Sequence, residues 1–389
     1  MWVVKTAIVG ESPIKILYAH NGDSVYDEMF VRFLVERGHE VHFFTILNAT
    51  RLPKWQQERY CKTLDIPGLR VHSRPSDHWN PAIVAPVLRM LLQRIKPDVL
   101  VGNSLQSYAF FSSLSNYHPF VAVVWGSDVL IAPKSIVGRM RAILTLACAD
   151  HVVVDSVVQA QATMHLGCNP SKIVSFPWCV DLDEFNPLLK FDELRRDLGY
   201  TTKDFIVLCN RQHESIYGLE YLFRAIPCVL QRIPTCRFLI LGQGSLTNQL
   251  KGLVKELGVE AQVRFEGNVI HEMMPKYISI SDAYVSPSLS DGTSASLLEA
   301  MACQKPVIAT EIAGNLEWVR TGESGILVPP RNSSAIADAI VTLAIDPALA
   351  KSCGREALRI ARRRANLKLS LAKFEALLYE ASDCDRRRH

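Results

Sequence analysis

At 389 residues the chain is longer than one hydrophobic core usually supports, so two domains of ordinary size are expected. Its 48% hydrophobic and 21% charged residues are typical of a globular protein. The formal net charge of +4 is too small to indicate nucleic acid binding, but it is compatible with an anionic ligand or an anionic membrane surface.

Cysteine spacing and hydropathy bear on the cellular compartment. The ten cysteines are scattered at irregular spacing without a CxxC pair, which favours reduced core thiols over a disulfide framework or a zinc site. No apolar run approaches the roughly 18 residues that predict a membrane-spanning helix. The apolar start Met1–Val4 is interrupted by Lys5, so no signal peptide is expected and the chain is interpreted as cytoplasmic.

The first half of the chain alternates short apolar runs with helical patterns. A strand at 14–19 leads through a turn at 21–24 into a helix that ends at Gly38. Further strands are predicted at 41–45, 98–101, 120–124 and 151–154, with helices around 85–95 and 136–148. Buried strands separated by helices indicate a parallel sheet that is covered on both faces.

After a polar segment that reaches Asp204, the same alternation begins again. Strands are predicted at 205–209, 237–241, 263–265, 283–285, 307–309 and 326–328. From Ser334 onward the pattern is wholly helical and ends in the solvated tail Arg386–Arg388. The predicted fold class is therefore α/β, with two doubly wound Rossmann-like domains and a ligand cleft at the carboxyl ends of their strands.

The segment after the strand at 283–285 predicts an anion site. Asp291–Ser294 reads Asp-Gly-Thr-Ser, which cannot continue a strand, and Ser296–Glu299 has the capping-box spelling of a helix start. Unpaired N–H groups at a helix start, with the positive end of the helix dipole behind them, favour a diphosphate. Asp291 and Glu299 would repel phosphate oxygens, so sugar and ribose hydroxyls are their natural partners. Alternatively, Glu299 only caps Ser296.

Taken in order, these motifs resemble the retaining glycosyltransferases of GT-B fold in glycosyltransferase family 4. Asp291, seven further residues and then Glu299 with Ala300–Ala302 occupy the places of the family's Glu-x7-Glu and Ala-Met-Ala. Arg211 follows a strand, as the family's phosphate-binding arginine does. The other matching segments are Arg37–Val41, Trp125–Asp128, Val180–Phe185, Leu241–Gly244, Phe265–Val269, Pro306–Ala309, Ala313–Glu317 and Thr321–Pro329.

The resemblance implies a domain plan and an activity. It implies an acceptor-binding domain over residues 1–190, a nucleotide-sugar-binding domain over 191–365, and a last helix, 366–389, that crosses back to the first domain. The implied reaction is retaining transfer of a hexose from a UDP- or GDP-linked sugar to a glycan, lipid-linked or small-molecule acceptor. The resemblance also implies that no metal, no other cofactor and no protein nucleophile is needed.

The resemblance assigns roles to individual residues. Arg211, Asp291 and Asp128 are the candidate catalytic residues. The role of Asp128 is inferred from its place at a strand end of the first domain, where it either orients an acceptor hydroxyl or caps the next helix. Glu299 is expected to bind the ribose, the backbone at Val269 the base, and Asp291 the donor sugar. The predicted donor-binding residues are Gly22, Arg211, Tyr217, Gly242, Val269, Asp291, Gly292, Thr293, Ser294, Ala295, Ser296 and Glu299.

Several positions depart from the family pattern. Asp291 stands where Glu is usual, Tyr217 where Lys is usual, and Cys179 where Gly is usual. The Tyr217 position either weakens the phosphate site or stacks within a rebuilt loop, with His213 or another group supplying charge, and we favour the second interpretation. Two alternatives stay open: a nucleotide-sugar epimerase of similar fold, and a catalytically silent partner protein.

Two further patterns have competing interpretations. Asp181-Leu-Asp183 spells the DxD string of metal-dependent transferases, but a turn after a strand is the preferred interpretation. The basic residues Arg89, Arg94, Lys96, Arg139 and Arg141 form either a solvated face or a peripheral contact with an anionic membrane at its inner face.

Overall fold

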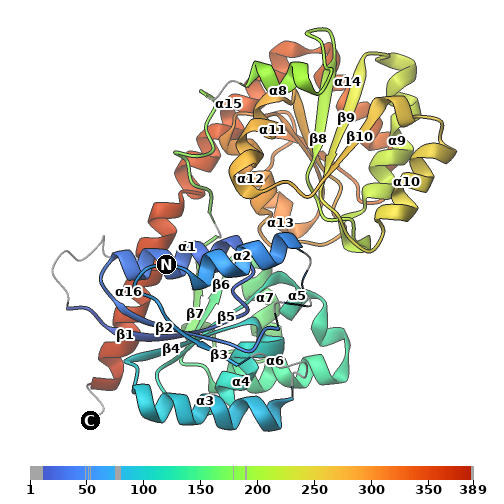
Figure 1. Ribbon diagram of the computed structural model, residues 1–389. Helices are drawn as coiled ribbons and strands as arrows, with labels where there is room; N and C mark the ends of the chain where they lie inside the picture. The colour runs from blue at the N-terminus through green and yellow to red at the C-terminus, as the bar shows by residue number, and fades with distance from the viewer. Residues whose placement is uncertain are drawn as a thin grey trace. The chain divides into compact units, whose positions relative to one another are not determined.

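The computed structural model describes residues 12–48, 50, 52, 54–74, 80–177, 179–188 and 191–386. The apolar start at 1–4 and the tail residues Arg387 and Arg388 lie outside the described residues. The chain divides into two compact units: unit 1 comprises Met1–Trp178 and Lys368–His389, and unit 2 comprises Cys179–Leu367 (Figure 1). The domain boundaries expected from the sequence, after residues 190 and 365, lie close to these divisions.

Unit 1 is built on a parallel sheet of seven strands in the order β3-β2-β1-β4-β5-β6-β7. The strands are β1 (Lys15–Ala19), β2 (Glu40–Thr45), β3 (Arg70–Ser73), β4 (Val99–Asn103), β5 (Phe120–Val123), β6 (His151–Val154) and β7 (Ile173–Ser175). Its helices are α1 (Val25–Glu36), α2 (Lys54–Leu64), α3 (Pro81–Ile95), the π-helix η2 (Ser104–Tyr108), α4 (Ala109–Ser113), α5 (Gly126–Leu130), η3 (Ala132–Lys134), α6 (Ile136–Cys148), α7 (Val157–His165), η4 (Pro170–Lys172) and the terminal α16 (Leu367–Arg386).

Unit 2 repeats the plan with six parallel strands in the order β10-β9-β8-β11-β12-β13. The strands are β8 (Phe205–Cys209), β9 (Cys236–Leu241), β10 (Val263–Gly267), β11 (Ala283–Ser286), β12 (Val307–Thr310) and β13 (Gly325–Val328). Its helices are α8 (Asp192–Asp197), η5 (Ser215–Tyr217), α9 (Leu219–Arg232), α10 (Thr247–Glu256), η6 (Glu260–Gln262), η7 (His271–Met273), α11 (Met274–Ile280), α12 (Ala295–Ala302), α13 (Ala313–Leu316), α14 (Ser333–Ile345) and α15 (Pro347–Arg364).

The predicted fold class is confirmed, because both units are parallel sheets with helices packed on them. The central strands are apolar and buried, which is why their sequences identify them: β4, β5, β11 and β12 are buried along their whole length. The sequence analysis did not predict the edge strands β3 and β7, because their residues are only partly buried or exposed. These two strands join the sheet through backbone pairing, β3 with β2 and β7 with β6, and not because they contain an apolar run.

Each sheet has one position where the strand order reverses direction. In unit 1 this switch point lies at β1, between β2 and β4, and in unit 2 it lies at β8, between β9 and β11. At such a point the helical connections leave toward opposite faces, so a crevice forms outside the carboxyl ends of the strands. The loops that follow β1, β4, β8 and β11 are therefore where functional residues are expected to gather.

The terminal helix α16 belongs to unit 1. Phe374 of α16 is 1% exposed and meets Phe30 of α1 edge to face, with their ring centroids 4.9 Å apart. Glu375 accepts a hydrogen bond from Arg37 Nε at 2.9 Å and lies 3.0 Å from His39 Nε2. These contacts join the chain's last helix to its first helix and to the turn that follows it.

Among the described residues, no single helix is long and apolar enough to cross a membrane. Helices α14 and α15 are long and apolar enough only when taken together, and the chain bends by 103° between them.

Candidate functional site

The candidate site of unit 2 is centred on the buried side chain of Arg211, which follows β8 at the switch point. Arg211 is 8% exposed. Its Nη1 donates to the hydroxyls of Ser294 at 2.7 Å and Ser296 at 2.8 Å, and its Nη2 donates to Asp291 Oδ2 at 2.5 Å. The loop after β11 and the start of α12 therefore close around the guanidinium that the loop after β8 supplies.

The electrostatics keep Arg211 charged although it is buried. Burial alone disfavours the charged form, but the attraction of Asp291 outweighs that effect, so the pKa of Arg211 is raised above its ordinary value. A buried guanidinium that lost this carboxylate would need another anion as its partner. The Nε of Arg211 is buried and has no partner among the described residues, so one donor of the fork is still available.

Tyr217 covers a face of the same guanidinium. Its ring lies under the Arg211 Cζ, which is 4.2 Å from the ring centroid, a distance typical of a cation–π contact. Of the two interpretations that the sequence left open for Tyr217, stacking is the one that the structure contains. His213 is not the source of a replacement charge: it is fully buried, and burial, followed by the repulsion of Lys251, lowers its pKa.

The helix after the site begins two residues earlier than the sequence predicted. Ser294, rather than Ser296, is the N-cap of α12, and its hydroxyl accepts from the backbone N–H of Leu297 at 3.4 Å. The capping box predicted between Ser296 and Glu299 is therefore wrong, because Ser296 already lies inside the helix and its hydroxyl is held by Arg211 and by Tyr284. Ser294 is the N-cap because its backbone is extended, which lets its hydroxyl accept a hydrogen bond from an N–H group of the first turn.

Gly242, a predicted donor-binding residue, has a structural requirement. It has φ +102°, and a Cβ at this position would come within 2.8 Å of the Arg211 carbonyl oxygen. The loop after β9 therefore packs its backbone directly on the backbone of Arg211, which only glycine permits.

The remaining predicted donor-binding residues of unit 2 lie between Asp291 and the first turn of α12, or in the loop after β10. Gly292 and Thr293 are buried, whereas Ala295 and Ser296 are half-buried at the helix start. Val269 is half-buried in the loop after β10, two positions before His271. The geometry thus brings Arg211, Tyr217, Asp291, Ser294 and Ser296 into direct contact.

Glu299 has a partner that sequence reasoning missed. His271 lies between two carboxylates, with its Nε2 3.2 Å from Glu299 Oε1 and its Nδ1 3.8 Å from Glu184 Oε1. Burial raises the pKa of Glu184, against the opposing attraction of His271. The sequence contains only a weak indication of this cluster. Glu184 lies in the segment Val180–Phe185 that matches the family pattern, but no sequence feature predicts that this segment lies near α12.

The DxD string forms a turn, as preferred. Asp181 Oδ1 accepts from the backbone N–H of Asp183 at 2.9 Å and of Glu184 at 3.4 Å. These are the hydrogen bonds of an Asx-type turn, which occupy one oxygen of Asp181.

In unit 1, Asp128 takes the capping role of its two alternatives. It is 2% exposed, and its two oxygens accept from the backbone N–H groups of Trp125 and Leu105 and from the Ser104 hydroxyl, each at 3.0 Å. Burial raises its pKa, and these hydrogen bonds oppose that shift. Asp128 thus joins the loop after β4 to the loop after β5, while its proposed contact with an acceptor stays a prediction.

Gly22, the other predicted residue of unit 1, lies in the turn after β1 with φ +85°. A Cβ there would meet the Phe43 ring at 3.1 Å, so the turn needs glycine for its backbone and for its packing.

The same turn holds a buried His–Asp pair that the sequence analysis did not identify. His20 Nδ1 contacts Asp27 Oδ2 closely, and the two residues are 7% and 0% exposed. Burial opposes protonation of His20, but the attraction of Asp27 outweighs it and the pKa of His20 is raised. Asp23 is near enough for the three to resemble a metal-ligand group, with ligand atoms within 4.8 Å of one another, although His20 and Asp27 already satisfy each other.

Two family models match the chain. Residues 15–156, in unit 1, match the family described as glycosyl transferase 4-like, and residues 203–346, in unit 2, match glycosyl transferases group 1. Both descriptions name glycosyl transferases.

Curated relatives carry names from the same class of enzyme. D-inositol 3-phosphate glycosyltransferase of Actinosynnema mirum is 30% identical over 237 residues, covering 58% of this chain and 57% of the relative. Alpha-D-kanosaminyltransferase of Streptomyces kanamyceticus is 30% identical over 157 residues, covering 40% of each chain. At this level of identity the chain spans about half the length of the curated relatives it matches. N-acetyl-alpha-D-glucosaminyl L-malate synthase of Bacillus anthracis matches 92% of the chain and 94% of its own length at 20% identity.

Solved structures agree on the fold. The Anabaena protein HepE, in complex with UDP and glucose, superposes with a TM-score of 0.79 at 18% identity, covering 94% of this chain and 99% of HepE. Sucrose-phosphate synthase from Thermosynechococcus elongatus superposes with a TM-score of 0.77 at 20% identity, covering 95% and 98%. The GT-B fold is therefore confirmed.

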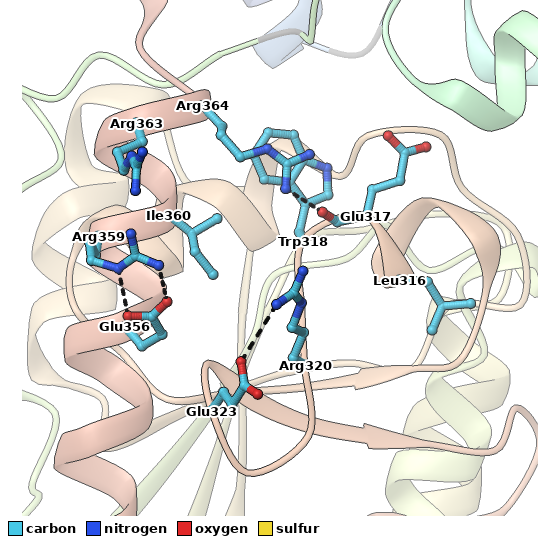
Figure 2. Close-up of a pocket in the computed structure, with 10 residues that line it drawn as sticks. All are labelled: Leu316, Glu317, Trp318, Arg320, Glu323, Glu356, Arg359, Ile360, Arg363 and Arg364. Atoms are coloured by element: carbon cyan, nitrogen blue, oxygen red, sulfur yellow. Dashed lines mark hydrogen bonds and ion pairs between the residues drawn. The ribbon is translucent and has the colours of Figure 1, made fainter.

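Unit 2 also contains an arginine-rich pocket of about 370 Å³ between α15 and the segment from α13 to β13 (Figure 2). Arg359 is paired with Glu356 and Arg320 with Glu323, while the Arg364 guanidinium lies over the Trp318 ring. Most of these arginines have partners, and cations are favourable in the last turn of α15. The arginines of this pocket are therefore explained by the packing of α15 on the segment from α13 to β13, without a ligand.

We predict that the His20–Asp27 pair gives unit 1 a pH-dependent stability. The pKa of His20 is raised above its unfolded value of 6.5, so the stabilisation is complete below pH 6.5 and is lost as the pH rises through the folded pKa. Urea denaturation should therefore show that Asp27→Asn costs most at acidic pH and less at alkaline pH. In a His20→Gln background the cost of Asp27→Asn should not vary with pH, and a pH-independent cost in the native background would contradict the assignment.

Proposed function

We propose that the protein is a retaining glycosyltransferase that moves a hexose from a nucleotide diphosphate sugar to an acceptor. The observation that carries the proposal is the buried Arg211, held at the start of α12 by two serine hydroxyls and one carboxylate. The family matches support glycosyl transfer, and the complexes of HepE with UDP and with UDP-glucose make UDP-sugars the first donors to test.

In the proposed donor site, Asp291 holds the place of the diphosphate until the donor arrives. A buried guanidinium is costly without a counter-charge, and Asp291 supplies that charge in the free protein. When a diphosphate takes over the guanidinium, Asp291 is released toward a neutral partner, and a hydroxyl of the donor sugar suits it. Asp291, which is the counter-charge of Arg211 in the ion pair, thus becomes the side chain that binds the donor sugar.

The rest of the donor is proposed to follow the polar residues around this point. Glu299 accepts from the ribose hydroxyls, with His271 orienting its carboxylate, and the backbone at Val269 contacts the base. The N–H groups at the start of α12 face the diphosphate, where the helix dipole favours negative charge. The proposed phosphate contact of the Gly22 backbone, in the other unit, stays a prediction.

The proposed chemistry rests on stabilising charge that develops on the leaving diphosphate. As the bond from the sugar to the phosphate oxygen breaks, negative charge grows on that oxygen, and Arg211 with the α12 start stabilises it without rearrangement. The acceptor oxygen forms its bond to the anomeric carbon on the face that the diphosphate leaves, and the leaving phosphate accepts the acceptor's proton, so neither a protein nucleophile nor a protein base is required. No metal is required either, because the guanidinium and the helix start supply the positive potential that a divalent ion provides in other transferases.

The acceptor is proposed to bind unit 1 and to be a glycan, a lipid-linked sugar or a small molecule. A cytoplasmic location with peripheral contact at the inner membrane face fits these acceptors. The buried residues around His20 and Asp128, which follow β1 and β5, form the polar region of unit 1 that supports this placement.

The function is tested by screening UDP- and GDP-linked hexoses for thermal stabilisation and for hydrolysis, with EDTA present throughout. We expect at least one donor to stabilise the protein and to be turned over in EDTA with retention at the anomeric carbon. Release of an epimerised nucleotide sugar would identify an epimerase instead, and an absence of any binding would identify a silent partner. Loss of turnover in EDTA that Mg²⁺ restores would overturn the metal-free mechanism.

We predict that Glu299→Ala raises the dissociation constants of UDP or GDP and of the donor alike, by roughly ten- to hundredfold, because a buried charged hydrogen bond to the shared ribose contributes about 1.5 to 3 kcal/mol. Asp291→Ala is the matched control. It should leave the affinity for free nucleoside diphosphate undiminished, because it removes a competitor for Arg211, while turnover falls. Calorimetry measures both, and equal losses of affinity in the two variants would refute the division of roles.

We predict that Tyr217→Lys weakens donor binding although it restores the residue that is usual in the family. The new ammonium would replace a ring whose centroid lies 4.2 Å from the Arg211 guanidinium carbon, so it removes the stacking and adds like-charge repulsion. Tyr217→Phe keeps the ring and should retain donor affinity within about threefold. Donor titrations decide the question, and a tighter-binding, faster Lys variant would show that the loop has not been rebuilt around Tyr217.

A further inference from the structure

Helix α6 of unit 1 exposes an apolar face to solvent. Ile136, Val137 and Met140 are 81%, 61% and 58% exposed, and Ile143 and Leu144 are 40% and 48% exposed. Their spacing in the sequence places all five on one side of the helix. The opposite side, with Ala142, Thr145 and Leu146, is buried, so α6 is apolar on both sides and the structure covers only one of them.

Helices α3 and α6 both pack against the buried helix α4. Arg141 of α6 lies over the Phe110 ring of α4, and Arg89 of α3 donates to the Leu114 carbonyl at the end of α4 at 2.7 Å, so α4 lies between α6 and α3. Figure 1 shows α3, α4 and α6 together on the same side of the sheet of unit 1. Helix α3 adds exposed Met90, at 61%. We call the exposed residues of α6, with Lys134 and Arg139, the α6 face.

The charge on this layer has one sign. Helices α3 and α6 contain no acidic residue, whereas Arg89, Arg94, Arg139 and Arg141 lie on them and Lys96 and Lys134 lie at their ends. Between residues 80 and 149 the sequence has only two acidic residues: Asp128, which is 2% exposed, and Asp98, which accepts from the backbone N–H of Lys15. Lys134 and Arg139 are exposed and flank the apolar residues of α6.

An exposed apolar helix face bordered by cations and free of carboxylates matches an anionic lipid surface. Apolar side chains enter the boundary between headgroups and acyl chains, and lysine and arginine at the border pair with lipid phosphates. A second copy of the chain fits less well, because two copies of this face would bring their cations together across the contact.

We propose that the α6 face docks unit 1 onto an anionic membrane surface. Ile136, Val137 and Met140 insert between the lipids, and Lys134 and Arg139 bind the headgroup phosphates. The proposal does not depend on the proposed glycosyl transfer, because it rests on burial and charge in α3 and α6 alone.

The test is co-sedimentation of the full chain with vesicles of phosphatidylcholine alone or mixed with phosphatidylglycerol. We expect binding to the mixed vesicles that weakens as salt is raised, and much weaker binding to phosphatidylcholine alone. Two paired substitutions divide the contributions: Ile136→Ser with Met140→Ser removes apolar contact, and Lys134→Glu with Arg139→Glu reverses charge. Each pair should lower the vesicle partition coefficient about tenfold or more.

Matched controls change the same chemistry elsewhere on the surface. Ile345→Ser with Leu369→Ser removes two apolar side chains that are 65% and 55% exposed, and Lys203→Glu with Lys351→Glu changes the net charge by the same amount at exposed positions. These variants should bind vesicles as the native protein does, apart from a small effect of net charge. Equal binding to both kinds of vesicle, no binding to either, or equal losses in face and control variants would overturn the proposal. So would a dimer in solution that Ile136→Ser with Met140→Ser dissociates, because the face would then be a protein interface.

Discussion

The candidate site depends on one constraint: a guanidinium buried at the switch point of unit 2 must always have an anionic partner. Arg211 is 8% exposed, and the groups around it are those that such a charge requires, with a carboxylate, two hydroxyls and an aromatic face. The N-cap of α12, the loop after β9 and the 3₁₀ turn at Ser215–Tyr217 all contact this residue or its backbone. In the structure, Asp291 is that anionic partner.

This constraint connects two of the departures from the expected family pattern, those at positions 217 and 291. With Lys and Glu at positions 217 and 291, the site would hold two cations and one carboxylate, whereas Tyr217 and Asp291 leave one cation and one carboxylate. The empty site is then neutral as a pair, and the aromatic ring stabilises the guanidinium without adding charge. Asp is one methylene shorter than Glu, yet it reaches Arg211 at 2.5 Å, so the shorter side chain suits a direct ion pair. The two departures therefore compensate each other in charge.

The sequence analysis predicted the strands and helices that have apolar runs. It missed the edge strands and the side-chain contacts, which depend on pairing between distant segments. Strands β6 and β8 and helix α6 have the predicted bounds, because burial leaves a continuous or periodic apolar signal in each. The edge strands β3 and β7 have no such signal, since none of their residues is fully buried. The error at Ser296 has a local cause: Ser294 and Ser296 are both able to cap, and only the extended backbone at Ser294 selects between them.

The same distinction explains the missed residues of the site. The sequence analysis named Arg211 and Asp291 because each follows a strand, and Glu299 because it lies early in the next helix, but it did not predict which side chains they contact. The Tyr217 contact with Arg211, the pairing of His271 with Glu299 and the pairing of His20 with Asp27 each join residues whose chemistry is ordinary in isolation. A lone histidine in a sequence is most often a core or surface residue. It becomes informative only when the fold buries it against a carboxylate, because the partner then decides its charge. Burial and pairing are properties of the folded chain. The charge of a side chain such as His20 or Arg211 therefore depends on contacts between loops that the strand order brings together.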